Sequence, residues 1–337
     1  MEIPAKTGYL GIDVGSVSTN LVILDEHADV LASIYRRTQG QPIKAVQEGL
    51  QELTDLLEDQ EIEVRAVGAT GSARHLTGII VGADVIKNEI TAHAVAASQV
   101  VPDVSTVLEI GGQDSKLIIL RDGVVTDFAM NSVCAAGTGS FLDHQSTRLG
   151  IPIEDFGSYA QRSESPAHIA GRCSVFAESD MIHKQQVGVN IDDIIYGLCH
   201  ALVRNYINNL GKGKDLESPI VFQGGVAANA GMKRAFEDAI GQEVVVPAHH
   251  NVMGAIGSAI LAMELELDPG ETGFKGFEVT GLSYETSTFG CNGCSNTCEV
   301  VRIKVGGKTL ARWGGRCGKW ENEDAPAKRK KERAAVR

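Results

Sequence analysis

The chain has 337 residues, with 31 Lys and Arg against 43 Asp and Glu, so its formal net charge is −12. Such an acidic balance disfavours nucleic-acid binding, because proteins that hold phosphate backbones usually carry an excess of basic charge. Apolar residues make up 43% and charged residues 22% of the chain, which excludes global disorder, and no apolar run is long enough to span a membrane.

Strand-like and helix-like segments alternate over residues 9–266, which predicts an α/β fold with largely buried sheets. The predicted strands are 9–13, 19–25, 30–36, 64–68, 106–110, 116–121, 124–130, 219–223 and 243–247. The predicted helices are 42–58, 89–101, 135–149, 153–160, 175–186, 191–210, 229–240 and 252–265.

The amino-acid composition of the sequence changes after residue 266. Residues 267–287 are rich in Gly, Thr and Glu, which predicts a loose connection. Residues 288–320 hold four of the seven cysteines. The last stretch contains a basic run, which is typical of a solvated tail.

An internal repeat organises the region before that change. Residues 12–24 align without a gap with residues 108–120, so that Asp13 falls on Glu109 and Gly15 on Gly111. Each copy contains a strand, an acidic residue, a glycine turn and a second strand. Two copies at a constant offset predict two related halves that face each other across a cleft. The predicted units are a first ATPase subdomain at 1–100, a second at 101–266, a cysteine-rich metal-binding module at 267–320 and a basic tail at 321–337.

The two turns have the chemistry of a phosphate site. Glycine allows backbone N–H groups to approach phosphate oxygens closely, and an acidic residue beside them suits hydrated Mg²⁺. Further blocks at 137–139, 221–229 and 254–257 complete, in order, a pattern similar to the phosphate, connection and adenosine elements of the actin, hexokinase and Hsp70 superfamily of ATPases. The expected nucleotide and Mg²⁺ contacts are Gly15, Ser16, Ser18, Thr19, Glu109, Gly111, Gly112, Gly137, Thr138, Gly139, Gly224, Gly225, Asn229 and Gly254.

Other nucleotide-binding folds are disfavoured. The sequence has neither the glycine-lysine loop of P-loop proteins nor a Gly-x-Gly-x-x-Gly turn that opens a helix. On the helix predicted at 252–265, Gly257 and Ala259 are small enough for close helix packing. For catalysis, we expect Asp13 near the Mg²⁺ ion, with Gln113 or Asp114 orienting the attacking water.

Cys134 and Cys173 each stand at the predicted start of a helix. Free N–H groups at such a position favour a thiolate and an anionic metal–sulfur centre. A [4Fe–4S] cluster normally needs four cysteines, and neither residue has a second cysteine close in sequence, so a cluster requires two chains. Two structural core cysteines are the alternative that the spacing leaves open. Cys199, inside a predicted helix, is interpreted as structural.

The motifs at 11–15 (GIDVG), 109–114 (EIGGQD), 134–139 (CAAGTG), 173–179 (CSVFAES) and 224–229 (GGVAAN) have a common resemblance. They resemble the activator ATPases of 2-hydroxyacyl-CoA dehydratases, a family that includes ATPase subunits of benzoyl-CoA reductases and reductases of double-cubane cluster proteins. The resemblance implies a homodimer in which Cys134 and Cys173 of both subunits hold one bridging [4Fe–4S] cluster. The start of the sequence lacks the basic and long apolar stretches of an export signal, so we expect a cytoplasmic protein. It also implies that ATP drives one-electron transfer to an iron–sulfur dehydratase or reductase component. Glu109 departs from the usual Asp, which puts its ligand role in doubt.

The remaining cysteines follow a pattern of their own. Cys291, Cys294 and Cys298 precede a predicted hairpin with Gly306 and Gly307 at its tip, and Cys317 follows it. Four thiolates around a short hairpin predict a metal site that suits zinc or a second [4Fe–4S] cluster, with a slight preference for the cluster. The segment would relay electrons from a ferredoxin or flavodoxin, or act only in docking.

Two other functions stay open at this stage. The first is a small-molecule kinase of the same superfamily, and the second is an ATP-binding maturation factor for a metal site. Neither needs a cysteine at the start of a helix, so Cys134 and Cys173 separate them from an activator.

Overall fold

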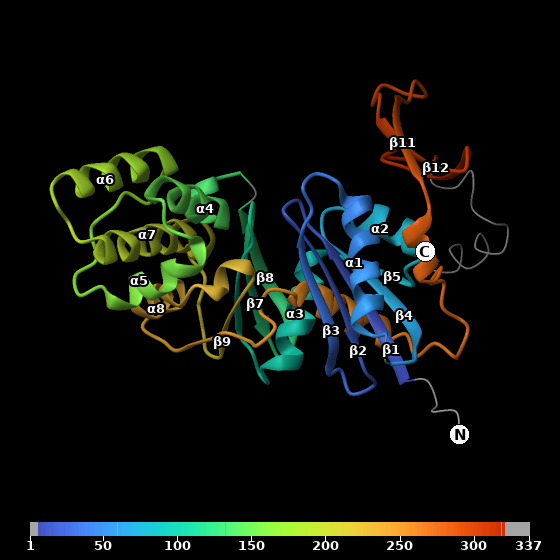
Figure 1. The fold of residues 1–337 in the computed structure, drawn as a ribbon, viewed down its shortest axis with the longest axis horizontal. Helices are drawn as coiled ribbons and strands as arrows, with labels where there is room; N and C mark the ends of the chain where they lie inside the picture. The colour runs from blue at the N-terminus through green and yellow to red at the C-terminus, as the bar shows by residue number, and fades with distance from the viewer. Residues whose placement is uncertain (1–5, 59, 132, 318, 321–337) are drawn as a thin grey trace.

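The computed structural model describes residues 6–58, 60–131, 133–317 and 319–320. Two lobes, each built on a five-stranded sheet, lie side by side, and a small three-stranded sheet stands on the first lobe (Figure 1). The predicted basic tail at 321–337 lies outside the described residues. None of the described helices is both long and apolar enough to cross a membrane.

The first lobe contains a sheet of strand order β3-β2-β1-β4-β5. Its elements are β1 (Lys6–Val14), β2 (Ser18–Leu24), β3 (Val30–Arg37), α1 (Pro42–Leu56), β4 (Ile62–Thr70), α2 (Arg74–Val81) and β5 (Val85–Ile86). Side chains of β2 alternate between two apolar clusters. Leu21 and Ile23 pack with α1, whereas Val22 and Leu24 pack with the helix Met253–Met263 on the other face of the sheet. The period of two thus buries both faces of the sheet.

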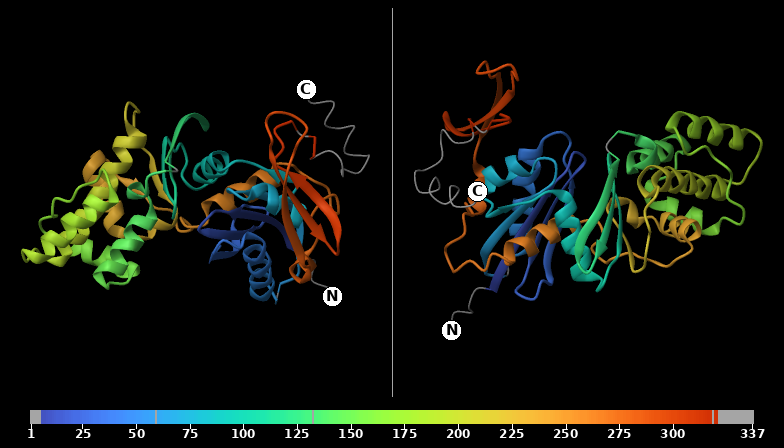
Figure 2. Two further views of the ribbon diagram at one scale, coloured as in Figure 1. Left: turned by 90° about the horizontal axis from the view of Figure 1, so that it is seen from above. Right: turned by 180° about the vertical axis from the view of Figure 1, so that it is seen from behind.

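The second lobe repeats this plan with strand order β10-β9-β6-β7-β8. Its strands are β6 (Thr106–Ile110), β7 (Ser115–Arg121), β8 (Val124–Asn131), β9 (Ile220–Gln223) and β10 (Val244–Val245). Its helices are α4 (Gly139–Leu149), α5 (Phe156–Arg162), α6 (Ser174–Gln186), α7 (Ile191–Tyr206) and α8 (Ala230–Ile240). These helices cover the face of the sheet that points away from the first lobe (Figures 1 and 2).

Two helices join the lobes: α3 (Glu89–Val100) and α9 (Met253–Met263). Ala94 and Ala97 of α3 pack with the second sheet, whereas α9, which comes from far along the chain, packs on the first sheet. The helices cross where Gly257 meets Ala92, because a Cβ atom placed on Gly257 would overlap the carbonyl of Ala92. Ala259 also lies close to Gly11 of β1, where an added Cβ atom would be 2.7 Å from Ala259 N. The predicted close packing at Gly257 and Ala259 is therefore confirmed.

The internal repeat is visible in the strand pairing. Asp13 pairs with Asn20 in the β1–β2 ladder, and Glu109 pairs with Lys116 in the β6–β7 ladder. Both turns close with the same hydrogen bond: the Gly15 N–H donates to Ser18 O at 2.9 Å, and the Gly111 N–H donates to Asp114 O at 3.0 Å. The two halves therefore present the same turn at equivalent places.

Each strand and helix predicted before residue 266 has a counterpart, but some boundaries differ. The predicted helix 135–149 divides into a short 3-10 helix, Ala135–Gly137, and α4, because Thr138 is extended. The predicted helix 153–160 begins as a 3-10 turn, and the last turn of 191–210 is a π-helix. The short elements α2 and β5 were not predicted, since eight and two residues carry little periodic signal.

The C-terminal region contains a 3-10 helix (Phe277–Gly281) and strands β11 (Tyr284–Gly290), β12 (Glu299–Val305) and β13 (Lys308–Trp313). The hairpin predicted around Gly306 and Gly307 is confirmed. The loose connection expected at 267–287 is wrong, because its second half is bound to the first lobe. The Gln47 side chain donates to three carbonyls between Val279 and Leu282, at 2.8 to 3.1 Å, and Val279 is buried in the core of that lobe.

Candidate functional site

A polar cavity lies between the lobes where the two repeated turns face each other. The turns touch: a Cβ atom placed on Gly112 would lie 2.8 Å from the Val17 side chain. Most of the predicted site lines this cavity, namely Asp13, Gly15, Ser16, Ser18, Glu109, Gly111, Gly112, Gln113, Asp114, Gly224, Gly225 and Gly254. The repeat in the sequence thus becomes two walls of one cavity.

A second cavity of about 330 Å³ continues from the first, a volume in the range of ligand sites. Gly139 and Asn229 line it on the second lobe, and Tyr35 and Arg37 line it on the first. Gly224 lines the first cavity, and the next residue, Gly225, lines both. The φ of Gly224 is +92°, a left-handed conformation that favours glycine. Together the cavities offer a polar part and a less polar part.

Three predicted contacts lie behind the cavity walls. The buried Thr19 hydroxyl is 2.9 Å from the Thr38 hydroxyl, which donates to Gly15 O at 3.0 Å, so this pair supports the first turn from below. Thr138 is buried and donates to Ala135 O at 2.9 Å. A Cβ atom on Gly137 would lie 2.7 Å from the side-chain oxygen of Asn205. Gly137 and Thr138 therefore belong to the loop of Cys134.

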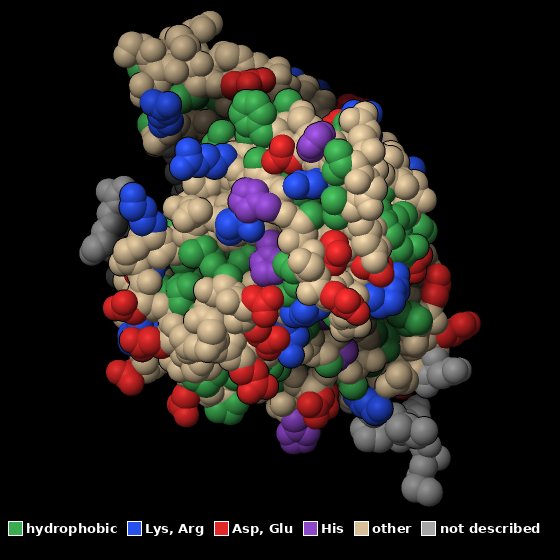
Figure 3. Space-filling view, turned by 90° about the vertical axis from the view of Figure 1, so that its left-hand side faces the viewer, with side chains coloured by type: hydrophobic (Ala, Val, Ile, Leu, Met, Phe, Trp, Pro, Cys, Tyr) green, Lys and Arg blue, Asp and Glu red, His purple; other side chains and the backbone are tan. Residues whose placement is uncertain are grey.

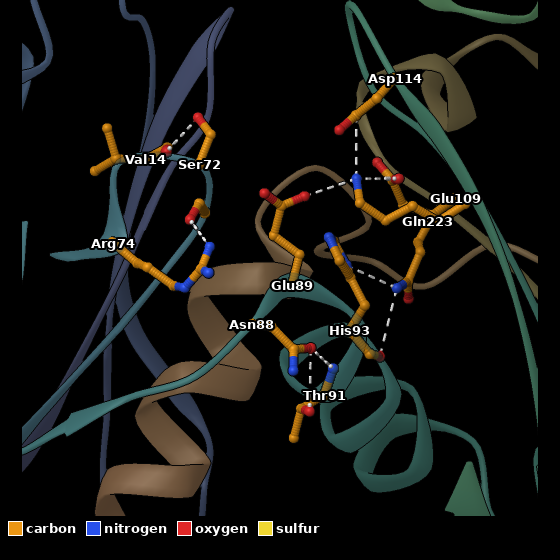
Figure 4. A network of polar contacts seen from close by, with 12 residues as sticks. Val14, Ser72, Arg74, Asn88, Glu89, Thr91, His93, Glu109, Asp114 and Gln223 are labelled. Atoms are coloured by element: carbon orange, nitrogen blue, oxygen red, sulfur yellow. Dashed lines mark hydrogen bonds and ion pairs between the residues drawn. The ribbon is translucent and has the colours of Figure 1, made fainter. Parts of the chain in front are cut away.

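The sequence did not single out the cation at the centre of the polar cavity. Lys116 Nζ lies 2.9 Å from Glu89 Oε2, 2.9 Å from Glu109 Oε2 and 3.1 Å from Asp114 Oδ1, and its side chain is only 2% exposed. In Figure 4 the dashed lines converge between Glu89, Glu109 and Asp114. A signal was available, because Lys116 aligns with Asn20 in the repeat and directly precedes the apolar run 117–120.

The two repeated carboxyl groups, Asp13 and Glu109, both have a raised pKa but differ in their contact with Lys116. Burial, with repulsion from Glu89, raises the pKa of Asp13 to about 7. Burial raises the pKa of Glu109 to about 8 even though Lys116 opposes the shift. Against the effect of its own burial, the surrounding carboxylates raise the pKa of Lys116 well above its ordinary range. Of these two carboxyl groups, Glu109 has a direct ion pair with Lys116, whereas Asp13 has none among the described residues.

The connecting helix α3 is tied to the second lobe by two side chains one turn apart. Glu89 makes the ion pair with Lys116, and His93 Nδ1 lies 2.9 Å from Gln223 Nε2 at the end of β9. Burial and the nearby Lys116 lower the pKa of His93 to about 3, so the imidazole is neutral. The helix that joins the lobes is thus in direct contact with the charged residues of the cavity through Glu89 and His93.

The loops of Cys134 and Cys173 lie on the second lobe. Cys173 precedes α6 directly, as predicted. Cys134 precedes only a three-residue 3-10 helix, so the helix-dipole argument does not apply to it. Asn131 holds this loop instead: its amide donates to Cys134 O, and its oxygen accepts from Cys134 N, both at 2.9 Å.

A single side chain of α7 connects the two cysteine loops. Asn205 donates to Gly171 O at 2.6 Å, two residues before Cys173, and its oxygen lies against Gly137 in the Cys134 loop. Both thiols are partly exposed. Apolar residues beside them face solvent, with Val133 95% and Phe176 65% exposed. The end of the molecule that the second lobe forms carries hydrophobic side chains among acidic and basic ones (Figure 3).

The second turn and the Cys134 segment are directly hydrogen bonded. The Gly139 N–H donates to Gly111 O at 2.8 Å, and the Ser140 N–H donates to Gly112 O at 2.9 Å. Four residues lie between Cys134 and Gly139. Hydrogen bonds therefore connect the second turn to the start of α4, directly after the thiol-bearing loop.

The other cysteines lie in different surroundings. Cys199 is buried in α7, where burial raises the pKa of its thiol to about 12, as suits a structural residue. At the small sheet, Cys291 is buried, Cys298 is partly exposed, and Cys294 and Cys317 are exposed. Within the described ranges, no three Cys, His, Asp or Glu side chains are already arranged to hold a metal ion.

A model of the BadF/BadG/BcrA/BcrD ATPase family matches residues 10–262. The (R)-2-hydroxyglutaryl-CoA dehydratase activating ATPase of Acidaminococcus fermentans is 35% identical over 258 residues, which cover 75% of this chain and 96% of that protein. The activator of the 2-hydroxyisocaproyl-CoA dehydratase from Clostridium difficile, solved with bound ADPNP, has a TM-score of 0.70 at 30% identity, over 77% of this chain and 95% of that chain.

More distant structures share the fold alone. A xyloylose kinase from Brucella ovis matches with a TM-score of 0.52 at 10% identity, over 81% of this chain and 92% of that chain. The predicted two-lobed ATPase fold of the actin and hexokinase type, with a small C-terminal module, is confirmed.

Proposed function

This chain belongs to the BadF/BadG/BcrA/BcrD ATPase family, and on that premise we propose that it uses ATP to drive one-electron transfer to a partner iron–sulfur enzyme. The family relationship makes it an ATPase, and its relatives include activators of acyl-CoA dehydratases. The partner, the cluster and the roles of individual residues belong to the proposal.

ATP would bind between the lobes, with its phosphates at the two turns and its adenosine in the adjoining cavity. Gly112 offers its backbone N–H group at the second turn, and Gly225 and Asn229 line the less polar part. Mg²⁺ fits beside Asp13, because the cavity holds more carboxylates than cations. The cavity also offers Asn20 Oδ1, which is buried without a hydrogen-bond partner among the described residues.

Hydrolysis needs a group that orients water toward the terminal phosphate. Gln113 and Asp114 both line the cavity, but Asp114 Oδ1 is 3.1 Å from Lys116 Nζ. Lys116 therefore holds Asp114 in place, and Gln113 keeps its side chain available for the water. We assign orientation of the water to Gln113 and positioning to Asp114.

The donor set on the second lobe fits a shared cluster. Cys134 and Cys173 supply two surface thiols per chain, and a [4Fe–4S] cluster normally takes four. A second copy of the chain supplies the other two, and the exposed Val133, Val175 and Phe176 provide apolar surface for it to cover. A cluster held there would store the transferred electron in a position that a partner can approach.

The hydrogen bonds between the second turn and the start of α4 carry the proposal. Nucleotide binding draws the two turns together, and Gly111 and Gly112 pass that movement to Gly139 and Ser140. Asn205, which is hydrogen bonded to Gly171, passes the same movement to the loop of Cys173. ATP turnover thus changes the surroundings of both thiols without any contact between nucleotide and sulfur.

The partner class follows from the relatives. Two of them are activators that serve different acyl-CoA dehydratases, one for 2-hydroxyglutaryl-CoA and one for 2-hydroxyisocaproyl-CoA. We propose an iron–sulfur dehydratase or related reductase component as the electron acceptor, with a ferredoxin or flavodoxin as the donor.

The test is anaerobic reduction of a 2-hydroxyacyl-CoA dehydratase component by the dithionite-reduced protein. We expect reduction to require ATP, to fail with a non-hydrolysable analogue, and to fall at least about 100-fold in Cys134→Ser while ATP binding is kept. Cys199→Ser is the matched control and should transfer electrons normally. Equal reduction without ATP would overturn the proposal, and full activity in Cys134→Ser would favour the kinase or maturation-factor alternative.

A further inference from the structure

We propose that one zinc ion is bound at the end of the small sheet by Cys291, Cys294, Cys298 and Cys317. This site is separate from the thiols of the second lobe. The site lies beyond the part of the chain that the family model matches, which ends at residue 262. It therefore goes beyond the proposed function and does not depend on it.

Strand pairing brings three of these cysteines to one edge. Gly290, the last residue of β11, pairs with Glu299, the first residue of β12. Cys291 and Cys298 are the next residues on each side, and the Cys291 N–H donates to Cys298 O at 2.8 Å. Cys294 lies in the loop between them, where the Thr297 N–H donates to Cys294 O at 3.3 Å. The loop is thus a tight turn closed by two cysteines with a third inside it.

The chain after β13 returns to the same edge. A Cβ atom placed on Gly314 would lie 2.7 Å from Glu299 O, so this residue passes over the start of β12. Further on, the Trp320 ring packs edge-on against Phe289 of β11, with 5.0 Å between ring centroids. Cys317 lies midway between these two anchors. Three residues of chain span at most about 10 Å, so the fourth thiol stays within reach of the other three.

The charges around this edge suit a tetrathiolate ion. Four thiolates and one divalent ion carry a net charge of −2, which nearby cations offset. Arg302 lies over the Phe289 ring at 5.8 Å, and Lys319 Nζ lies 4.9 Å from the centre of the Trp320 ring. Both basic groups therefore lie on the aromatic pair formed by Trp320 and Phe289, which is two residues before Cys291.

The small sheet also needs an added crosslink. Among the described residues from 284 onward, only Cys291, Val300 and Ile303 are buried. Three buried side chains give a weak core for three strands, and modules of this size are commonly stabilised by a bound metal. An ion that joins the β11–β12 loop to the segment after β13 would fix all three strands at one end.

The position of the sheet favours a structural ion over an electron relay. The module is anchored to the first lobe through Gln47 and Val279, whereas Cys134 and Cys173 lie on the second lobe (Figures 1 and 2). The slight preference for a second [4Fe–4S] cluster came from ligand type, and this placement within one chain gives it no further support. A closed site with four cysteines is typical of structural zinc.

The test is metal analysis of the full chain purified without oxygen, with Cys294→Ser and Cys317→Ser compared with Cys199→Ser. We expect about one zinc per chain in the parent and the control, at least a tenfold loss in both test variants, and unchanged iron and ATP hydrolysis. Cys134→Ser should lose iron and keep zinc, which separates failure of this site from failure of the proposed function. Unchanged zinc in both test variants, or a loss of iron and sulfide from them in place of zinc, would overturn the proposal.

A second measurement covers variants that do not fold. Cobalt exchanged into the parent protein should give the visible absorption of a tetrahedral cobalt–thiolate centre, and a chelator should speed proteolysis between residues 284 and 317. Absence of that absorption in metal-exchanged parent protein would contradict a tetrathiolate site.

Discussion

The two copies of the repeated hairpin have the same backbone and different chemistry. The first copy pairs Asp13 with Asn20, and the second pairs Glu109 with Lys116. A neutral partner leaves the first carboxylate open to a cation, whereas the buried lysine compensates the second. Among the described residues, only the second copy is hydrogen bonded to a cysteine-bearing segment, through Gly111 and Gly139. The two copies thus supply two equivalent turns of different chemistry, and under the proposed function the first would hold the cation and the second would transmit movement.

The largest effect should come from removing the compensating charge of the second copy. Lys116→Ala leaves Glu89, Glu109 and Asp114 without their common partner, so we expect the free energy of unfolding to fall by about 3–5 kcal/mol. Denaturant unfolding measures this, and adding Glu109→Gln should restore part of the loss. The matched change in the first copy, Asn20→Ala, should cost about 1 kcal/mol. Equal losses for the two variants would contradict the asymmetry.

Removal of the first carboxylate should affect catalysis more than removal of the second. Asp13→Asn removes the proposed cation ligand, so ATP hydrolysis should fall by about 100-fold or more. Glu109→Gln, in which Lys116 loses one of three carboxylate partners, should reduce the rate by about tenfold or less. Steady-state hydrolysis at several Mg²⁺ concentrations checks both. A larger loss in Glu109→Gln would reverse the proposed roles.

Acid should weaken the contact between α3 and the second lobe through His93. The folded protein keeps this buried histidine neutral, with a pKa lowered from 6.5 to about 3, so the unfolded chain binds more protons between these values. Stability is therefore lost as the pH falls below about 6.5, by up to about 1.4 kcal/mol per pH unit, or about 2 kcal/mol at pH 5. His93→Asn should flatten this dependence in denaturant titrations, whereas the same change at the exposed His27 should leave it as in the parent. If the free energy of unfolding of His93→Asn depended on pH as it does in the parent, other titrating groups would be responsible for the acid sensitivity.

The smallest effect concerns the space around the first carboxylate. A Cβ atom on Gly254 would overlap Asp13 Oδ2, so Gly254→Ala should displace the carboxylate. We expect a loss of about tenfold in hydrolysis, equivalent to about 1.4 kcal/mol, with cooperative unfolding retained. Gly281→Ala is the control, because a Cβ atom there meets nothing within 4 Å. Full activity in Gly254→Ala would mean that Asp13 has no fixed position to lose.

The sequence predicted the parts of this arrangement that repeat or alternate. The 12–24 and 108–120 match predicted two equivalent turns, and apolar periodicity predicted the strands and helices around them. Lys116 and Glu89 were missed because their meeting depends on how α3 packs between the sheets, which no local pattern encodes. Asn205 was missed for the same reason, since its two contacts, Gly137 and Gly171, are 34 residues or more away from it in sequence. The break at Thr138 was missed although Gly137 and Gly139, which disfavour a helix interior, flank it on both sides.

The most direct test of the account is native mass spectrometry of the protein purified without oxygen. Two chains that share a centre through Cys134 and Cys173 should give a dimer carrying four iron and four sulfide, and Cys134→Ser should give iron-free protein of normal ATP affinity. A single chain that retains its own iron, or iron that persists in Cys134→Ser, would contradict a cluster held between two copies.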